Sequence, residues 1–302
     1  MDISFEQLTI FVTTAEMGSF SAAGRHLGKA QSAISTAISN MEIDLGVTLF
    51  SRAGRTPSLT EAGTRLLAEA RVVLDRHAHF IGVACSLEKH VETRLVLAVD
   101  ELYPEPVLAR LLHSFAETFP SVELEILFPF MEDVSRLVLD GQADLGIMWR
   151  QETLPAVLGF HTLGWVPLQL VCARDHPLAD QVIEWEELKR HRQLMVATRS
   201  ESEEKRRLRI AADVWWVESQ WVILQLARQG IGWAFVSDHI IAASSAARDL
   251  VIPRLAFDTA DWPVAMELIW HKQRPQGPAS QWLAKRFISE KIGVMSTADC
   301  NS

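Results

Sequence analysis

The stretch from Ser19 to Leu45 constrains this chain more than any other, because its spacing fits two short helices joined by a tight turn. In the second half, apolar residues recur at steps of four, three and four and so share one face of a helix: Ile34, Ile38, Met41 and Leu45. That helix is expected to begin near Gln31. The preceding helix, about 21–27, is built mainly of small residues that allow close approach, and Gly28 begins the turn. The pattern predicts a helix-turn-helix over about residues 21–40.

The opposite face of the second helix carries no carboxylate and is rich in hydroxyl and amide groups. Its members are Gln31, Ser32, Ser35, Thr36, Ser39 and Asn40. Such groups can hydrogen-bond to base edges and phosphates when a helix lies in the major groove of DNA. The alternative is an ordinary solvated helix face, and the sequence on either side favours the DNA-reading interpretation.

That flanking sequence resembles the LysR-type transcriptional regulators. Residues 44–67 read DLGVTLFSRAGRTPSLTEAGTRLL, and in that family the pattern LGxxLFxRxGRxxxLTxAG follows the recognition helix and forms the wing. Upstream positions also fall in register with the family: Phe11, Ala15, Gly18, Ser19, Phe20, Ala23, Leu27, Gln31 and Ser35. The match is specific over about the first 65 residues and looser beyond them.

The resemblance implies that DNA is contacted from the start of the recognition helix and from its exposed face. Carried over position by position, the DNA-binding residues are Ser21, Gln31, Ser32, Ser35 and Thr36. Residues 50–60 read as a two-stranded wing, in which Arg52 and Arg55 flank the turn and can reach phosphate or the minor groove.

Two departures from the family pattern concern this helix. The family commonly has Ser just before Gln31, whereas this chain has Ala30, and losing that N-cap costs on the order of 1 kcal/mol. The family also often has Arg or Lys where Thr36, Ser39 and Asn40 stand. Fewer charges on the helix should move the anchoring on phosphate toward the wing.

The net charge of −9 is unevenly distributed along the chain. Residues 1–90 carry 8 Lys/Arg against 9 Asp/Glu, so that −8 lies beyond them, and residues 21–60 alone carry +2. A local basic patch on an acidic protein predicts modest non-specific affinity for DNA, which falls steeply with salt.

A long helix is predicted from Thr60, its N-cap, to about Glu88. Residues that are apolar or small, except for one histidine, step along it by four and three in a heptad seam: Leu66, Ala70, Val73, His77, Phe80, Ala84 and Leu87. A helix about 40 Å long with no other core to cover this seam predicts a second subunit as its partner. His77 and His79 are two apart and point to different helix faces, so no metal site is expected.

Beyond Thr93 the alternation of elements changes to that of an α/β domain. Strands are expected at 94–99, 122–128 and 144–149, with helices at 104–119 and 133–140, which implies a parallel sheet with right-handed crossovers. A second lobe is expected to contain strands at 169–173 and 194–197, a helix at 221–228 and the apolar strand region 230–238. The chain then returns to the first lobe through 265–270 and a final helix at 279–292.

The predicted fold class is therefore α/β, with three parts. These are a winged helix-turn-helix DNA-binding domain at 1–60, a linker and dimerisation helix at 61–90, and an effector-binding domain at 91–302. The effector domain should have two lobes of the periplasmic-binding-protein kind, lobe I at about 91–163 and 265–302 and lobe II at about 164–264.

Ligands of open parallel sheets bind beyond the carboxyl ends of the strands. By this rule the effector-binding residues are Asp100, Glu101, Leu102, Phe130, Met131, Thr198, Arg199, Ser200, Glu218 and Ser219. The LysR family often has Ser or Thr at the position of Asp100, where a helix N-terminus helps to bind an anion. Asp100 and Glu101 oppose an anion, so we expect an effector that is neutral, cationic or aromatic. The alternative is that both acids are solvated or cap the next helix.

All ten tryptophans lie at or after Trp149. Four of them gather in the second lobe: Trp215, Trp216, Trp221 and Trp233. They could line a pocket, although packing in the core is the more common role of such residues.

The sequence predicts a cytoplasmic transcription factor, controlled by a small-molecule effector, that binds an interrupted palindrome in double-stranded promoter DNA. It is expected to be a homodimer through the linker helix, the resemblance implies a homotetramer, and RNA polymerase is kept as a candidate partner. No apolar run reaches the roughly 20 residues of a membrane span, and no signal peptide is recognised, so neither a membrane nor export is expected.

The main alternative is a solute-binding or transport protein with the same two-lobed fold, which the helix-turn-helix and the missing signal peptide disfavour. No motif indicates an enzyme, a cofactor or a metal site. Three widely spaced cysteines suggest no disulfide framework, and a redox switch between Cys172 and Cys300 has little support.

Overall fold

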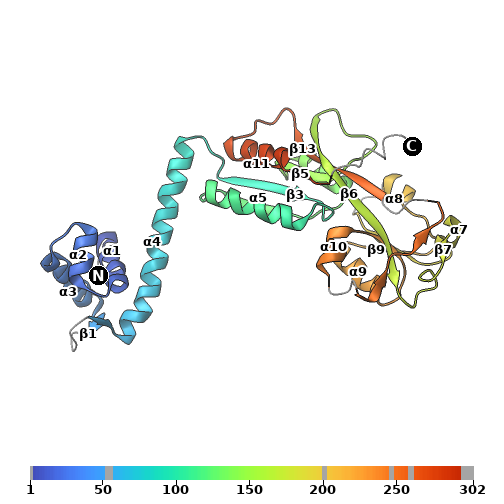
Figure 1. Cartoon of the computed structure of the whole chain (residues 1–302). Coiled ribbons are helices and arrows are strands. Elements are labelled where there is room, and N and C mark those ends of the chain that lie inside the picture. The colour runs from blue at the N-terminus through green and yellow to red at the C-terminus, as the bar shows by residue number, and fades with distance from the viewer. Residues whose placement is uncertain (1–2, 52–56, 199–202, 245–247, 258–261, 294–302) are drawn as a thin grey trace. The chain divides into compact units, whose positions relative to one another are not determined.

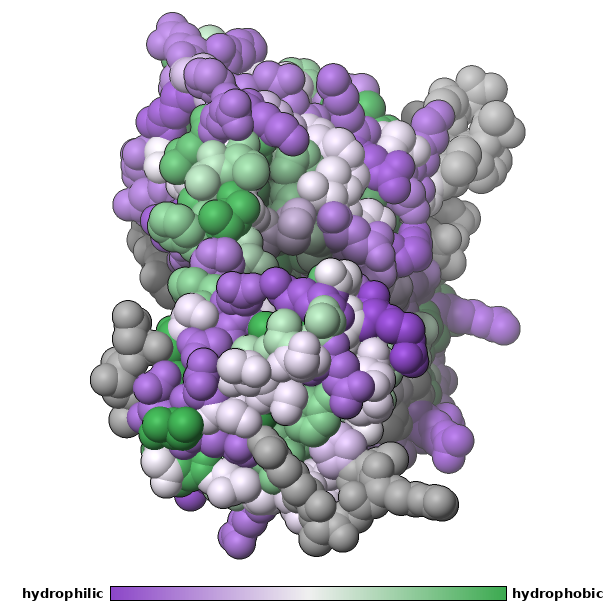
Figure 2. Space-filling view, turned by 90° about the vertical axis from the view of Figure 1, so that its left-hand side faces the viewer, coloured by the Kyte–Doolittle hydropathy of each residue, from purple (hydrophilic) through white to green (hydrophobic). Residues whose placement is uncertain are grey.

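The computed structural model describes residues 3–51, 57–198, 203–244, 248–257 and 262–293. The chain divides into two compact units, residues 1–85 and 86–302, and each is described by itself. Among the described residues, none of the helices is both long enough and apolar enough to span a bilayer. The face drawn in Figure 2 mixes hydrophilic side chains with separate groups of hydrophobic ones.

The first unit holds three helices, a short two-stranded wing and most of a long helix. Its elements are α1 (Phe5–Met17), α2 (Phe20–Leu27), α3 (Gln31–Leu45), β1 (Phe50–Ser51), β2 (Ser58–Leu59) and α4 (Glu61–Glu88). β1 and β2 pair antiparallel, with Phe50 opposite Leu59. The small core contains the buried side chains of Ile10, Phe11, Ala23, Ile34, Ile38, Met41, Leu49, Phe50 and Ala70.

Local chemistry sets the helix boundaries in this unit. Ser4 and Gln7 form a capping box at the start of α1, and Ser19 accepts a hydrogen bond from the backbone of Ala22 at the start of α2. α1, α2 and α3 each end at a glycine in the left-handed conformation, which costs little where there is no Cβ. A Cβ on Gly24 would lie 2.7 Å from the carbonyl oxygen of Lys29, so the turn between α2 and α3 requires a glycine there.

The second unit begins with alternating strands and helices. Its first elements are β3 (Arg94–Val99), α5 (Glu105–Thr118), β4 (Glu123–Leu127), α6 (Glu132–Asp140), β5 (Leu145–Trp149) and β6 (Leu158–Ala173). The second lobe adds β7 (Val182–Ile183), α7 (Trp185–Leu188), β8 (Gln193–Val196), α8 (Glu203–Arg207), β9 (Val214–Val217), α9 (Gln220–Arg228), β10 (Ala234–Ser237), α10 (Asp238–Ala243), β11 (Leu250–Val251) and β12 (Arg254–Leu255). β13 (Trp262–His271) and α11 (Pro278–Ser289) complete the unit.

The main sheet has the strand order β10-β6-β13-β5-β3-β4, with β11 also paired to β6. β3 runs parallel to both β4 and β5, as the alternation of strands and helices predicted. α5 and α11 cover one face of the sheet around Leu97, Leu111 and Phe287, and α6 covers the other around Ala98 and Val134. The two faces alternate along β3, which is why that strand reads as a continuous apolar run.

One strand, β6, is shared by the two lobes. It pairs with β13 over 158–168, with β10 over 168–171 and with β11 over 172–173, and Figure 1 shows it passing from one lobe into the other. The expectation of a strand at 169–173 alone was too short. Gly159, Gly164 and Pro167 interrupt the apolar alternation, and the partner strand β13 lies about a hundred residues later in the chain. The last helix is also shorter than expected, because Ile292 leaves it to pair with Gly164.

Candidate functional site

The predicted DNA-reading face lies on the outside of α3. Ile34, Ile38 and Met41 are buried, as their spacing predicted. On the other side Gln31, Ser32 and Thr36 are exposed, and Ser35, like Ser21 on α2, is partly buried. Arg52 and Arg55 lie outside the described residues. The five described candidates therefore occupy the start of α2 and the first two turns of α3.

Two of these candidates contact each other. The Ser21 hydroxyl donates a hydrogen bond of 2.8 Å to Oε1 of Gln31, although the residues belong to different helices. α3 begins after Ala30 without any side-chain cap, as the sequence predicted, so its first backbone N–H groups remain available to an acceptor such as a phosphate.

One basic side chain near this face is already paired within the unit. The ammonium of Lys29 lies 2.7 Å from Oε1 of Glu6, and this contact lowers the pKa of the Glu6 carboxyl. The pairing reduces the positive charge that Lys29 can offer to a phosphate. The arginines of the wing are therefore expected to supply more of the attraction to the DNA backbone.

The base of the wing is fixed by polar contacts on both sides. The Glu42 carboxylate on α3 accepts hydrogen bonds from the backbone N–H groups of Leu49 and Phe50. Thr60 caps α4, as predicted, by accepting from the N–H of Gly63 at 2.9 Å, and its hydroxyl also donates to the carbonyl of Thr48 at 2.6 Å. A Cβ on Gly63 would lie 2.1 Å from the carbonyl oxygen of Leu49, so the start of α4 presses against the wing backbone.

α4 leaves much of its apolar surface uncovered. Its exposed large hydrophobic residues are Val72, Val73, Phe80, Ile81 and Leu87. Phe80 is 68% exposed, whereas Ala70, nearer the start of the helix, is buried in the core of the unit. The ring of His77 packs against Phe5 of α1, with centroids 4.2 Å apart. The predicted seam is thus covered at its start, and from Val73 onward it is exposed apart from the contact of His77 with Phe5.

A cavity of about 130 Å³ lies between the two lobes of the second unit. Its lining from lobe I and the crossing strands is Asp100, Leu102, Phe130, Met131, Trp149, Leu168 and Val264. Its lining from lobe II is Trp185, Gln193, Leu194, Met195, Val196, Arg207, Leu208, Ile210, Gln220 and Phe235. Most of these side chains are apolar, and four are aromatic. The strand-end rule therefore identified four lining residues, namely Asp100, Leu102, Phe130 and Met131.

Asp100 is the charged group deepest in this cavity. It is 1% exposed, and its two oxygens accept hydrogen bonds from the backbone N–H groups of Leu102 at 3.0 Å and Met131 at 2.9 Å. Burial raises the pKa of the Asp100 carboxyl to about 6, and the two N–H donors limit the rise. Met131 has the unusual φ of 51°, so Asp100 holds a turn whose conformation a non-glycine residue rarely adopts.

Other predicted cleft residues join the lobes instead of lining the cavity. Oε2 of Glu101 accepts a hydrogen bond of 2.8 Å from the backbone N–H of Gln220, at the positive end of α9. Burial raises the pKa of Glu101. From lobe II, the Thr198 hydroxyl donates to Oε1 of Glu132 at 3.2 Å. Both contacts join lobe I to lobe II.

The remaining candidates lie elsewhere. Ser219 caps α9 by accepting from the N–H of Val222 at 3.4 Å. Glu218 lines a separate cavity of about 370 Å³, together with Phe128 and Arg136. Arg199 and Ser200 fall outside the described residues.

Sequence reasoning missed the other thirteen lining residues, among them Gln220 and two tryptophans, Trp149 and Trp185. Gln220 follows Ser219 directly and is the first residue of α9. The signal available in the sequence is an amide side chain directly before a run of apolar residues. The tryptophan cluster singled out from the sequence contributes no residue to this cavity: Trp233 is in the lobe II core, and Trp215 lies under the guanidinium of Arg192. Core packing was the better interpretation for Trp233.

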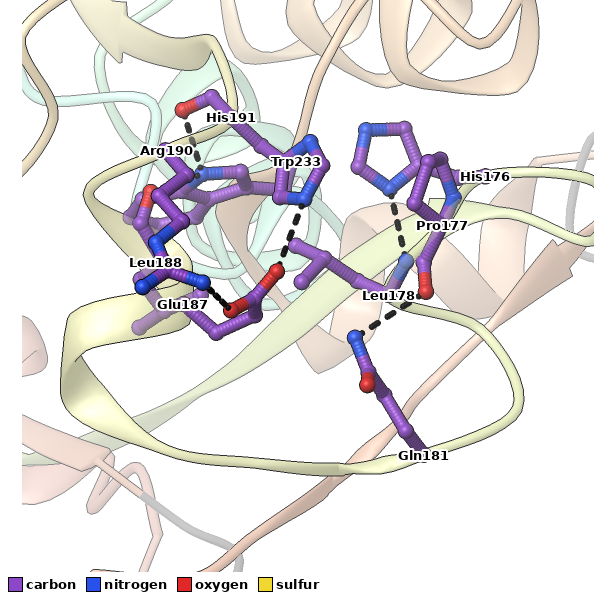
Figure 3. A network of polar contacts seen from close by, with 9 residues as sticks. All are labelled: His176, Pro177, Leu178, Gln181, Glu187, Leu188, Arg190, His191 and Trp233. Atoms are coloured by element: carbon purple, nitrogen blue, oxygen red, sulfur yellow. Dashed lines mark hydrogen bonds and ion pairs between the residues drawn. The ribbon is translucent and has the colours of Figure 1, made fainter.

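A polar network holds the end of α7, the short helix that begins with the lining residue Trp185. Nε1 of Trp233 donates to the carbonyls of Leu188 and His191, both at 3.1 Å, which anchors the end of α7 (Figure 3). The ring of His191 lies 5.2 Å from that of His176, and burial together with His191 lowers the pKa of His176. Trp185, the first residue of α7, packs against the core cluster that contains Leu188 and Trp233.

A winged helix-turn-helix unit and a two-lobed unit with an interlobe cavity define a ligand-responsive DNA-binding regulator. A family model described as "LysR substrate binding domain" matches residues 88–290, and one described as "Bacterial regulatory helix-turn-helix protein, lysR family" matches residues 5–64. The chain belongs to the LysR family of transcriptional regulators, with an effector-binding substrate domain.

Known relatives agree with this placement. The chain is 30% identical to the HTH-type transcriptional regulator AceR of Acinetobacter baumannii over 302 residues, covering 97% of this chain and 99% of the relative. It is 32% identical to the uncharacterised HTH-type transcriptional regulator YbhD of Escherichia coli over 203 residues, covering 67% and 63%. These relatives are regulators and not transporters, so the alternative of a solute-binding protein is set aside.

Solved structures show the same fold. Full-length BenM superposes with a TM-score of 0.55 at 18% identity, covering 95% of this chain and 96% of that one. A hydrogen peroxide-bound mutant of Corynebacterium glutamicum OxyR superposes with a TM-score of 0.52 at 24% identity, covering 96% and 94%. At these identities the comparison concerns the fold alone.

Proposed function

We propose that this regulator reads promoter DNA with the exposed start of α3 and with the wing. Ser21, Gln31, Ser32, Ser35 and Thr36 are the proposed contacts of the helices, and Arg52 and Arg55 those of the wing. The observation that carries this proposal is the polar, carboxylate-free face of α3 beside an uncapped helix N-terminus. Gln31 can read a base edge, while the hydroxyl groups and the arginines position the DNA-binding unit on the phosphate backbone of the DNA.

The proposed division of labour follows the domains predicted from the sequence: residues 1–60 read DNA, 61–90 dimerise, and 91–302 bind the effector. Lobe I, at about 91–163 and 265–302, and lobe II, at about 164–264, would hold the effector in the cavity that Asp100 and Gln220 line. Thr198 and Glu101 would sense the effector indirectly, because their hydrogen bonds join the lobes.

The proposed oligomer is a homodimer through α4, assembled further into a homotetramer. Exposed apolar residues on α4 support the dimer, since a surface such as that of Phe80 and Leu87 is stabilised by burial against a second copy. The tetramer rests on the family alone. RNA polymerase is a further proposed partner, the proposed location is the cytoplasm, where promoter DNA lies, and the role is regulation and not catalysis.

Footprinting tests the DNA-reading proposal directly. The full chain would be bound to genomic fragments at several salt concentrations, beside the Gln31→Ala variant and the matched variant Ile43→Ala, whose side chain is exposed on the same helix but apolar. We expect protection of an interrupted palindrome by the wild type and by Ile43→Ala, and its loss in Gln31→Ala. Equal protection by all three proteins would contradict the assignment of α3 as the reading helix.

A further inference from the structure

The size of the interlobe cavity limits what can occupy it. Its volume is about 130 Å³, and an apolar protein cavity of roughly 150 Å³ accommodates one benzene ring. Four aromatic side chains surround this space, those of Phe130, Trp149, Trp185 and Phe235. Flat apolar walls of this kind favour a planar ring through stacked and edge-on contacts. A single aromatic ring therefore matches the cavity in both volume and chemistry.

The polar side chains that line the cavity differ in how far they are already satisfied. The Asp100 oxygens accept hydrogen bonds from two backbone N–H groups. Both ends of the Gln193 amide have partners, because its oxygen accepts from the backbone N–H groups of Ile210 and Ala211 and its nitrogen donates to the carbonyl of Leu208. Gln220 differs from both. Its side chain lines the cavity and is 2% exposed, yet its Oε1 has no hydrogen-bond partner.

A buried carbonyl oxygen without a partner costs free energy that a ligand donor can recover. An anionic group would instead meet the Oε1 atom of Gln220 and the Asp100 carboxylate, both of which repel it. Among the described lining residues the cation is Arg207, which is half-exposed and forms an ion pair with Glu152. An ammonium group would have to leave water for an apolar space in which Asp100 already accepts two hydrogen bonds.

We propose that the effector is an uncharged molecule with one aromatic ring and one hydroxyl or amino donor, which hydrogen-bonds to Oε1 of Gln220. This inference rests on the proposed function in one respect, namely that the interlobe cavity is the effector site. It goes beyond the expectation made from the sequence, because it fixes the size, the neutral charge and the atom that recognises the donor.

Calorimetric titration of the full chain at pH 7.5 tests this class with five probes of one ring each: phenol, aniline, toluene, benzoate and benzylamine. We expect phenol and aniline to bind about two- to tenfold more tightly than toluene, which has the ring but no donor. Benzoate and protonated benzylamine should bind at least about tenfold more weakly than phenol. Tightest binding by either ion, or binding of none of the five probes, would overturn the proposal.

Two variants assign the donor contact. Gln220→Leu keeps a side chain of similar size and leaves the backbone N–H that Glu101 accepts, so it should reduce phenol binding to the level of toluene. Gln225→Leu makes the same change at an exposed position of α9 and should bind like the wild type. Retained toluene binding by Gln220→Leu shows that its cavity is intact, and unchanged phenol affinity in that variant would overturn the role of Gln220.

Footprinting on promoter DNA separates this inference from the proposed function. A titration with the expected order of probes, but no protected DNA, supports the ligand class while the DNA-reading proposal fails. A protected palindrome together with preferred binding of benzoate overturns the ligand class and leaves the DNA-reading proposal in place.

Discussion

The hydroxyl of Ser21 and the amide oxygen of Gln31 are 2.8 Å apart and hydrogen-bonded across the turn between α2 and α3. The first side chain of α3 is therefore held by the helix that precedes it. Because α3 has no N-cap of its own, this contact between helices takes over part of the ordering that a cap provides.

We predict that Ser21→Ala weakens DNA binding by about 0.5–1.5 kcal/mol, the usual net value of one hydrogen bond. Gln31→Ala should cost about 1–3 kcal/mol on the specific site and little on random DNA. Neither residue is charged, so the dependence of the binding constant on salt should keep its slope. Fluorescence anisotropy with labelled DNA measures all three quantities, and in the double variant the two losses should be less than additive. Additive losses would show that the two residues act independently.

We predict that Gly63→Ala destabilises the DNA-binding unit by about 1–3 kcal/mol, because its Cβ would meet the Leu49 carbonyl at 2.1 Å. Hydrogen exchange of the amides of Leu49 and Thr60 should speed up, and the affinity for DNA should fall. Ala68→Ser, an exposed change on the same helix, serves as the control and should leave exchange at these amides unchanged. Exchange rates in Gly63→Ala equal to those of the wild type would contradict this prediction, because they would mean that the wing backbone shifts to accept the Cβ without loss of stability.

We predict that Phe80→Glu shifts the proposed dimer toward monomer, since it places a charge in the middle of the exposed seam of α4. Sedimentation velocity over a range of concentrations measures the shift. His79→Glu introduces the same charge one residue away, off the seam, and should leave the association intact. A dimer of unchanged affinity in Phe80→Glu would place the interface elsewhere.

We predict a specific effect of pH on stability from Asp100. Its pKa rises from 3.8 to about 6 on folding, so between these values the folded protein holds a proton that the unfolded chain releases. The stabilisation from this group is complete below pH 3.8 and is lost as the pH rises through 6, a change on the order of 3 kcal/mol. Asp100→Asn lacks this effect, so its deficit relative to the wild type should shrink from pH 4.5 to pH 7.

Denaturant unfolding followed by tryptophan fluorescence suits this measurement, because all ten tryptophans lie at or after Trp149, in the second unit. The lowered pKa values of His176 and His239 act in the opposite direction, since their contribution is lost as the pH falls below 6.5. Those histidines are common to both proteins, so their effects cancel in the difference. A deficit that stays constant with pH would contradict the raised pKa of Asp100.

The DNA-binding unit could be predicted closely from the sequence because its determinants are local. The spacing of Ile34, Ile38 and Met41 gives the buried face, and Gly28 marks the end of α2. α3 begins at Gln31, as predicted, and Thr60 caps α4. In each case the residues that decide the structure lie within a few positions of one another.

The effector domain was harder to predict where distant segments meet. Neither the length of β6 nor its sharing between lobes follows from its own composition, since β13 supplies the pairing. The strand-end rule found Asp100 and Met131, because backbone topology alone carries them to the cavity. It could not tell that Gln220 turns inward while Glu218, two residues earlier, lines another cavity, because rotamers and packing decide that.

The close backbone contact between Gly63 and Leu49 has a consequence for operator architecture. The helix-turn-helix and the start of α4 form one rigid unit. In the proposed dimer, the distance between the two helix-turn-helix units is therefore set by the paired α4 helices and not by a flexible linker. Inserting one base pair between half-sites rotates them by about 35° relative to each other, as DNA has roughly 10–10.5 base pairs per turn. A promoter carrying such an insertion would have to untwist to be bound. The spacing between half-sites in the promoter is therefore constrained by the length of this helix.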